Sequence, residues 1–450
     1  MKPEAATLQP NAGVRLTPIQ WLTCAIAALG FAFDLYETLM LPLIVRPAIE
    51  DLGKLSSGSY DFNLWVGLLF FIPSTIGGIF GLLGGYLADR LGRRRLLVWS
   101  IVLYGFSACA ASFATSLPAL LIFRCTTLAG VCVQFVAAIT WLAELFPDPR
   151  TRESVLAYTQ ACTTFGGLLV TGAYYLAVTY GDHLPQIQGS HEAWRYTLLS
   201  GLVPALPLII ARPFLPESPV WLEKKSLRIL KRPSLTAVFQ PALRRTTLVA
   251  TLLVACTFAL PYGAMQHTSR MVPGLPDVRL FAPRHVEQIV SSVQFVQELG
   301  GFAGRVIFAV LIIRIVAQRA RIYTIIVAAL PAFFWLYFFA ATHSLSSVKL
   351  GIFVATLLFN MLHSFWGNYL PRVYPTYLRS TGESFATNIG GRVIGVFAAL
   401  LTTQLSNVMP GHTVGARLAH SAGSVAALAC VIALIGSFWL REPEGDRLPD

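Results

Sequence analysis

The chain has 450 residues, of which 55% are hydrophobic and only 12% are charged. A soluble domain has roughly 25% charged residues, so this composition excludes an ordinary soluble protein and indicates a protein solvated by lipid. The formal net charge is +12. The basic residues stand in short segments between apolar runs, where charge sets membrane orientation, and we therefore expect no nucleic-acid partner.

Apolar runs long enough to cross a bilayer, about 20 residues each, recur along the whole chain. We expect twelve transmembrane helices. The first six are predicted at Pro18–Val45, Asn63–Ala88, Leu96–Ala114, Leu117–Phe146, Glu153–Tyr180 and Trp194–Phe214. The last six are predicted at Leu243–Gln266, Val286–Ile313, Ile322–Thr342, Val348–Pro371, Tyr377–Leu405 and Ala416–Leu440. Thr17 and Pro18 form a good helix start after a polar segment, so no cleaved signal peptide is expected.

One long polar connection divides these spans into two groups of six. The expected organisation is a cytoplasmic tail at 1–16, a bundle at 17–214, a cytoplasmic linker at 215–242, a second bundle at 243–440 and a cytoplasmic tail at 441–450. Arginines gather in alternate loops: Arg90, Arg93, Arg94, Arg95, Arg150, Arg152, Arg319, Arg321, Arg372 and Arg379. Because basic residues are retained on the cytoplasmic side, both termini are expected in the cytoplasm.

The 7 cysteines all fall inside apolar runs and lack the spacing typical of metal ligands. They are interpreted as small buried apolar groups, so we expect neither a disulfide nor a metal site. The sequence shows no cluster of nucleophile, base and orienting residue, so we expect no enzymatic activity and no cofactor.

The two groups of spans repeat weakly. Thr163-Thr164-Phe165-Gly166-Gly167 in the fifth span matches Thr387-Asn388-Ile389-Gly390-Gly391 in the eleventh. Two similar six-helix bundles that face each other are what alternating access by rocking requires.

The loop after the second span reads Gly84-Gly85-Tyr86-Leu87-Ala88-Asp89-Arg90-Leu91-Gly92-Arg93-Arg94-Arg95. It resembles the G-x-L-x-D-R-x-G-R-[KR] signature of the major facilitator superfamily. The resemblance implies an all-α membrane protein with twelve transmembrane helices in two six-helix pseudo-repeat bundles, and a transporter of a small solute. It also implies a gating role for the loop residues Asp89, Arg90, Arg93 and Arg94.

Further motifs suggest a branch of that superfamily. Arg124 with Gly130, followed by Glu144-Leu145-Phe146-Pro147 and an arginine at 150 or 152, resembles a pattern of sugar porters and of metabolite or organic-ion transporters, and adds Glu144 to the gating residues. Pro216-Glu217-Ser218-Pro219-Val220-Trp221-Leu222 resembles the P-E-S-P-R-[WY]-L signature, with valine in place of arginine. Asp34-Leu35-Tyr36-Glu37 resembles the D-G-Y-D element of aromatic-acid/proton symporters, with leucine in place of glycine.

Ionisable residues at membrane depth are costly and mark a transport or proton pathway. At about 1.5 Å rise per residue, Asp34 lies roughly 24 Å along a helix that starts at Pro18, and Glu37 lies one turn closer to the outer surface. Arg124 has enough reach to approach Asp34, and protonation of that carboxylate would leave the arginine free. We therefore expect proton coupling at Asp34, Glu37 and Arg124. A static structural salt bridge is the alternative.

In the second half, Glu298 and Arg392 fall near the midplane of the eighth and eleventh spans. The planar guanidinium of Arg392 suits a carboxylate, so we expect it to bind an anionic substrate or to pair with Glu298 when the site is empty. Further candidate substrate contacts are polar or aromatic residues at similar depth: Gln160, Asn360, His363 and Trp366. The alternatives are a helix-packing role for Arg392 and hydrogen bonding between helices for the others.

The preferred function is proton-coupled transport of a small organic acid or related metabolite by alternating access. Proton-linked sugar uptake or drug efflux is the alternative within transport, and a transporter-like sensor that binds without transport comes from another class. The expected partners are a small-molecule substrate, protons and the lipid bilayer. We expect a monomer in a plasma membrane, specifically a bacterial inner membrane.

Overall fold

The computed structural model of the chain describes residues 16–146, 148, 151, 155–156, 158–159, 161–211, 215–226, 235–310, 315, 317–375 and 378–443. These residues are helical or lie in short connections, and none of them forms a β-strand. We call residues 16–211 the first half and residues 241–443 the second half.

The first half consists of long helices joined by short turns. Its helices are α1 (Pro18–Gly53), α2 (Tyr60–Leu91), α3 (Arg93–Ser112), α4 (Leu117–Leu145), α6 (Thr163–Tyr180), the short 3₁₀ helix η1 (Gly181–His183), α7 (Ala193–Ser200) and α8 (Leu202–Ala211). Three of the helices begin at a hydroxyl N-cap, because the side chains of Thr17, Ser59 and Ser116 accept hydrogen bonds from backbone N–H groups of the first turn. Two short elements, α9 (Pro219–Ser226) and η3 (Leu235–Phe239), lie in the connection to the second half.

The second half repeats this plan with more irregular helices. Its elements are α10 (Pro241–Gly263), η4 (Met265–His267), α11 (Thr268–Met271), η5 (Val272–Gly274), α12 (Pro283–Val310), α13 (Gln318–Trp335), η7 (Leu336–Ala340), α14 (Ala341–His343), α15 (Leu345–Val373), α16 (Arg379–Phe385), η8 (Ala386–Gly395), α17 (Phe397–Leu405) and α18 (Val414–Ser437). Both η7 and η8 are π-helical, so the ninth and eleventh spans each contain a wider stretch.

Twelve membrane-spanning helices account for the fold. Within the described residues, 9 helices are long and apolar enough to cross a membrane. The remaining three spans are α6, the α7–α8 pair and α12. The first turns of α12 are polar, because they contain Arg284, His285 and Glu287. The predicted fifth span also includes residues before Cys162 that lie partly outside the described residues.

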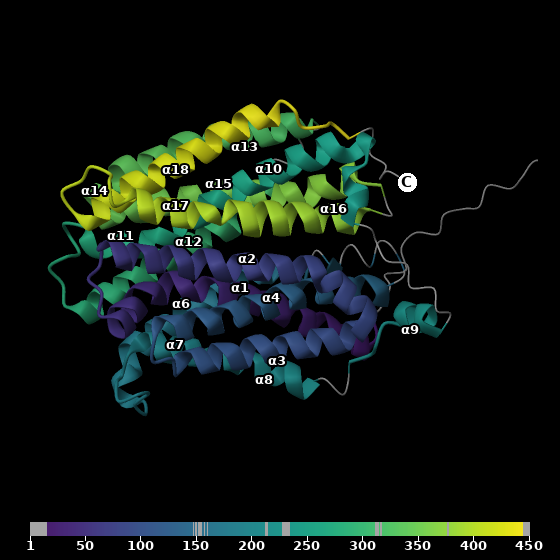
Figure 1. The fold of residues 1–450 in the computed structure, drawn as a ribbon, viewed down its shortest axis with the longest axis horizontal. Coiled ribbons are helices and arrows are strands. Elements are labelled where there is room, and N and C mark those ends of the chain that lie inside the picture. Colours follow the sequence, from purple (N-terminus) through teal and green to yellow (C-terminus); the bar gives the residue numbers. More distant parts are fainter. Residues whose placement is uncertain are drawn as a thin grey trace, which may run out of the picture.

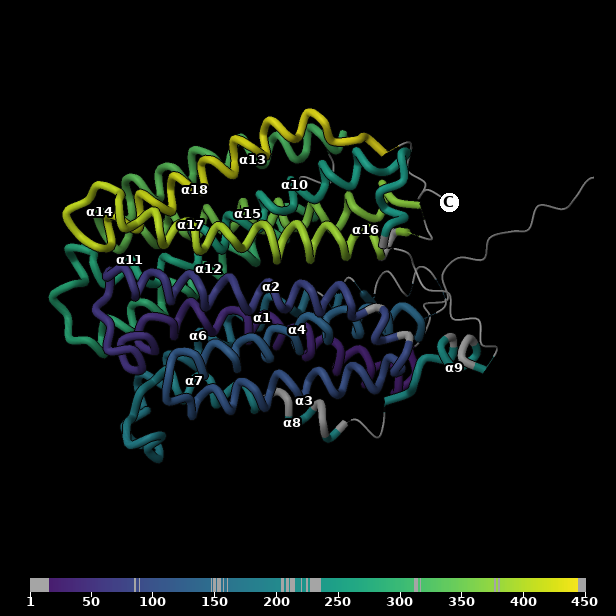
Figure 2. Tube along the Cα trace, in the orientation of Figure 1, coloured from purple at the N-terminus to yellow at the C-terminus, as the bar shows by residue number. Residues whose placement is uncertain are grey.

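The two halves lie side by side along their length, as the colours of the trace in Figure 2 show. Helix α2 packs on η8 and α17, and α6 packs on α12, so these five elements form most of the interface between the halves. Elements α9 and α16 lie at one end of the molecule, and α11 and α14 lie at the other (Figure 1). The expected orientation places α11 and α14 outside the cell, and we call that end the outer end.

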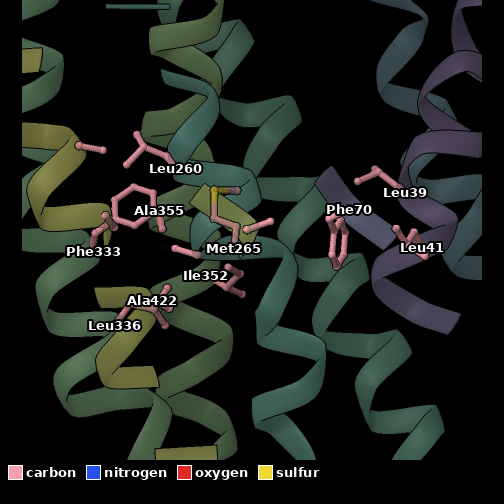
Figure 3. Packing of buried hydrophobic residues seen from close by; sticks show 14 of the residues in the cluster. Leu39, Leu41, Phe70, Leu260, Met265, Phe333, Leu336, Ile352, Ala355 and Ala422 are labelled. Atoms are coloured by element: carbon pink, nitrogen blue, oxygen red, sulfur yellow. The ribbon is translucent and has the colours of Figure 1, made fainter. Parts of the chain in front are cut away.

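The apolar core is continuous across the two halves. Leu39 and Leu41 of α1 and Phe70 of α2 belong to the same buried cluster as Leu260 and Met265 of the second half (Figure 3). The interface between halves is therefore apolar over much of its area, and the few polar groups that it contains stand out.

Paired glycines explain the repeat between the fifth and eleventh spans. A Cβ atom at Gly166 would collide with the backbone oxygen of Ala32 in α1, and one at Gly390 would collide with the backbone oxygen of Thr251 in α10. The same glycine in each half thus lets the fifth helix of that half approach its first helix closely.

Substituting Gly166 with alanine is expected to lower the stability of the folded protein by about 1–3 kcal/mol, because the added methyl group meets backbone that cannot move aside. Gly172 in the same helix is the matched control, since a Cβ there meets no atom within 4 Å. The thermal midpoint and the monodisperse yield of both variants in detergent measure the effect. Equal midpoints for Gly166→Ala and Gly172→Ala would contradict this close packing.

Each half is also closed in the same way at the end opposite α11. Glu217, after the sixth span, accepts a hydrogen bond of 3.1 Å from the backbone N–H of Arg94 at the start of α3. Glu442, after the twelfth span, accepts hydrogen bonds of 2.9 and 2.7 Å from the backbone N–H groups of Gln318 and Arg319 at the start of α13. In both places a carboxylate therefore caps the third helix of its half, where the helix dipole favours negative charge.

A glycine is required beside the first of these caps. Gly92 joins α2 to α3 with φ of 95°, a conformation that side chains rarely adopt, and a Cβ there would touch Glu217. The Gly92 of the loop signature is therefore explained by the turn that brings α3 onto its cap.

Candidate functional site

Two carboxyl groups of α1 lie inside the protein. The side chain of Asp34 is 6% exposed and that of Glu37 is fully buried. Within the described residues, neither oxygen of Asp34 has a hydrogen-bond partner. The cation that acts on Asp34 electrostatically is Arg392, which belongs to the other half. Glu37 packs against Gly201 in the sixth span.

Arg124 of α4 pairs with Glu37. Its Nη1 lies 3.9 Å from Glu37 Oε2, and its Nη2 donates a 3.0 Å hydrogen bond to the backbone oxygen of Glu37. The predicted pairing of Arg124 with Asp34 is therefore wrong. Helix α4 meets α1 one turn further along than expected, so Glu37 takes the partner that was assigned to Asp34.

A small cavity lies beside this pair, between the two halves. Arg124 lines it together with residues of α1, α2 and α4 and with Tyr262 of α10: Thr38, Leu41, Leu69, Phe70, Pro73, Ser74 and Leu128. The Nε and Nη1 atoms of Arg124 have no hydrogen-bond partner among the described residues. Arg124 thus retains unused N–H donors in an interface that is otherwise apolar.

Arg392 lies in the π-helical stretch η8 of the eleventh span. Its guanidinium contacts the thiol of Cys132 in α4, and Gly78 of α2 packs against its Cβ atom. Asp34 acts on it electrostatically. π-helical turns are rare and frequently mark functional positions, and this one presents a guanidinium across the interface.

Glu298 does not pair with Arg392, so the predicted pairing in the empty site is wrong. Glu298 lies in α12 against Gly167 of α6, where a side chain at residue 167 would collide with its carboxylate. It accepts hydrogen bonds of 3.0 Å from Gln294 and 3.4 Å from Gln297. The eighth span reaches the first half through α6, whereas the eleventh reaches it through α2, and this keeps the two side chains apart.

The other candidate substrate contacts are less closely tied to the interface. Asn360 accepts a 3.2 Å hydrogen bond from Arg305, and the indole N–H of the buried Trp366 donates to Thr257, so both join helices of the second half. His363 lies on α15 beside the rings of Phe258 and Phe359. Gln160 lies outside the described residues.

Three of the predicted gating residues meet at the end opposite α11. The guanidinium of Arg93 contacts both oxygens of Glu144, each at 2.9 Å, and Ser218 donates a 2.5 Å hydrogen bond to the same carboxylate. The side chain of Arg94 donates to the backbone oxygen of Leu215 at 2.9 Å. This cluster ties α3 and α4 to the segment that follows the sixth span. Arg90 is exposed outside the cluster, and the side chain of Asp89 lies outside the described structure.

Polar contacts join the two halves at the outer end. Arg46 forms an ion pair with Glu287, and Tyr174 donates a 2.5 Å hydrogen bond to the same carboxylate. Ser269 donates to the backbone oxygen of Pro42 at 2.5 Å. The structure is therefore closed on its outer side.

Several polar residues of the interior were not predicted from the sequence: Asn63, Tyr104, Cys132, Gln134, His267 and Arg270. The side chains of Tyr104 and Gln134 are fully buried without a hydrogen-bond partner in the described part of the chain, and Tyr104 lies within electrostatic reach of Asp34. A weak signal was available for His267 and Arg270, since apolar residues resume after them at Met271 and Val272.

Comparison with known proteins decides the family. The family model of the Major Facilitator Superfamily matches residues 21–400. The chain belongs to the major facilitator superfamily. The superfamily and the twelve-helix fold predicted from the loop signature are thus confirmed, and the chain is a multi-pass membrane transporter.

Relatives of this transporter are similar over most of their length. A protein of Cupriavidus pinatubonensis named as a probable 4-methylmuconolactone transporter is 26% identical over 425 residues, which cover 92% of this chain and 89% of the relative. The 3-(3-hydroxy-phenyl)propionate transporter of Escherichia coli is 27% identical over 366 residues, which cover 80% of this chain and 83% of the relative.

The fold of the transporter is similar to that of the xylose transporter XylE from E. coli in a partially occluded inward-open conformation. The TM-score is 0.70 at 18% identity, and the likeness covers 95% of this chain and 99% of that chain. At this identity the likeness concerns the fold alone.

Proposed function

We propose that the transporter carries a small organic acid by proton-coupled symport, with the acid bound between the two halves. The observation that carries the proposal is the buried carboxyl group of Asp34, which has no hydrogen-bond partner within the described structure and has Arg392 of the opposite half as its nearby cation. Arg392 and Arg124 supply the positive charge that an anionic substrate needs.

Competition for Arg392 couples the substrate to the proton. With the site empty, burial disfavours the charge of Asp34, and the cation of Arg392 opposes that effect. A bound carboxylate engages that cation instead, which leaves Asp34 as a buried charge without a partner, and uptake of a proton removes this charge. Substrate and proton therefore bind together, which is the requirement for symport.

The names of the relatives support an acid as the substrate. The transporter named for 3-(3-hydroxy-phenyl)propionate handles a carboxylate by its printed name, and the resemblance of the Asp34 segment to aromatic-acid/proton symporters points the same way. Proton-linked sugar uptake remains the second candidate because the fold is similar to that of a xylose transporter. Sugar sites are built from amides and aromatic rings, whereas buried arginines favour an anion.

Reconstituted vesicles test the proposal. We expect a pH gradient, acid outside, to drive accumulation of 3-(3-hydroxyphenyl)propionate but not of its amide, 3-(3-hydroxyphenyl)propionamide, which has the same shape without the charge. A protonophore should abolish the accumulation. Accumulation of D-xylose with no acid transport would favour the sugar alternative, and binding of the acid without flux would favour a sensor.

The proposal places the transporter in a bacterial inner membrane as a monomer with both termini in the cytoplasm. The arginine-bearing loops support that orientation, since they alternate in phase with the termini. Each protomer contains both halves of the interface, so transport needs no second copy. Gating belongs in this proposal to Asp89, Arg90, Arg93, Arg94 and Glu144.

A further inference from the structure

We propose that Arg270 forms a separate carboxylate-binding subsite on the outer side of the central site, and that the amide oxygen of Asn63 occupies this subsite while the outer side is closed. The inference rests on the proposed function, because it concerns the route by which an acid enters. Arg270 lies in α11, at the outer end of the molecule (Figure 1).

Arg270 is buried without a carboxylate in direct contact with it among the described residues. Its side chain is 6% exposed, and no carboxylate in the described part of the chain forms an ion pair with it. The nearby charged residues that act on it are Arg46 and Glu50, and Arg46 lies 3.4 Å from Glu50 and also pairs with Glu287. A buried cation without a carboxylate in direct contact is costly, so its retention calls for a function.

The direct contacts of Arg270 are all with neutral groups. Its Nη2 donates a 2.7 Å hydrogen bond to Asn63 Oδ1, its Nη1 lies 3.4 Å from His267 Nδ1, and its guanidinium lies over the ring of Phe62. Its Nε has no partner among the described residues. The guanidinium thus keeps an unused donor and has one strong acceptor, an amide oxygen.

Further donors surround the same spot. Asn63 Nδ2 donates a 2.8 Å hydrogen bond to Asn407, and Gln404 lies beside Asn407 with its own Nε2 unpartnered in the described structure. The fully buried His267 likewise has an unpartnered Nε2. A cluster that offers several N–H groups and contains no acid fits an anion, and the planar fork of an arginine fits a carboxylate best.

The bond between Asn63 and Arg270 crosses the interface between the halves. Asn63 belongs to α2 of the first half, and Arg270 to the second half. Alternating access by rocking separates the halves at the outer end, and this separation breaks the bond. Arg270 then faces the outer opening without its acceptor, and a carboxylate entering from outside takes the place of the Asn63 oxygen. On closure, Asn63 returns and displaces the carboxylate inward.

Entry kinetics measured from each side of the membrane test this role. Right-side-out vesicles report entry from outside, and inverted vesicles report entry from the cytoplasmic side, each with 3-(3-hydroxyphenyl)propionate as the probe. Arg270→Gln is expected to raise KM at least about tenfold for outside entry and to leave KM for cytoplasmic entry within about twofold. Asn63→Ala should change the outside KM in the opposite direction, because it removes the competing acceptor.

Arg279→Gln is the matched control, since Arg279 is an exposed arginine at the same end, and its outside KM should stay near that of the wild type. An equal rise of KM on both sides in Arg270→Gln, or no rise on either side, would overturn the subsite. If Arg270→Gln fails to fold, an outside KM that is unchanged in Asn63→Ala would overturn it as well. Failure of the wild type to transport the acid would instead count against the proposed function.

Discussion

Replacement of Asp34 with asparagine is expected to abolish accumulation of the acid driven by a pH gradient while leaving exchange of the acid across the membrane intact. The side chain is buried, and in the described structure neither carboxylate oxygen has a hydrogen-bond partner. Asparagine has the same shape but carries neither a proton to release nor a charge for Arg392. Net symport requires the release of that proton, whereas exchange of one substrate molecule for another does not.

Uptake with and without an imposed pH gradient, measured beside counterflow in reconstituted vesicles, separates the two activities. Asp61→Asn is the control, because Asp61 is an exposed acid at the outer start of α2. Gradient-driven accumulation by Asp34→Asn at the wild-type level would move the proton site elsewhere, with Glu298 next. Glu37→Gln cannot serve as a control, since it would leave Arg124 without its paired charge.

Replacement of Arg392 with lysine is expected to weaken binding of the acid at least about tenfold, equivalent to about 1.4 kcal/mol. The charge is retained, but an ammonium group cannot form the two parallel hydrogen bonds of a guanidinium with a carboxylate. Because the lysine side chain is shorter than that of arginine, its ammonium group would also lose the contact with the Cys132 thiol of the first half.

Equilibrium binding of 3-(3-hydroxyphenyl)propionate to the purified protein measures this loss. Arg417→Lys, at the outer start of α18, makes the same exchange away from the interface and should bind normally. Normal binding of the acid by Arg392→Lys would assign Arg392 to the packing of η8 against α2, which the contact with Gly78 already shows.

The sequence predicts well what depends on short segments. The loop after the second span identifies the superfamily, and the matched glycines of the fifth and eleventh spans identify the repeat, because both features reflect local packing. Hydropathy likewise places Asp34, Glu37, Arg124, Glu298 and Arg392 at membrane depth, and all of them lie within helices of the bundle.

The pairings of these residues could not be predicted in the same way. The spacing of a helix fixes the depth of a residue but not the rotation of that helix against its neighbours. Because α4 meets α1 one helical turn further along than expected, Arg124 forms its ion pair with Glu37 instead of Asp34. The eighth span packs on α6 and the eleventh on α2, and these different partners separate Glu298 from Arg392. Arg270 was missed because the seventh span was predicted to end at Gln266, whereas in the structure it continues through α11 and η5 to Gly274.

The glutamate caps bear on how the chain can be divided. Glu217 follows the sixth span and caps α3, and Glu442 follows the twelfth span and caps α13, so each cap comes from the segment directly after the last span of its half. Neither cap uses residues between Ser226 and Leu235. A break of the polypeptide in that interval leaves both closures in place, so the two halves can be made as separate polypeptides and assembled. The interface of α2, α6, η8, α12 and α17 is the surface on which they recognise each other.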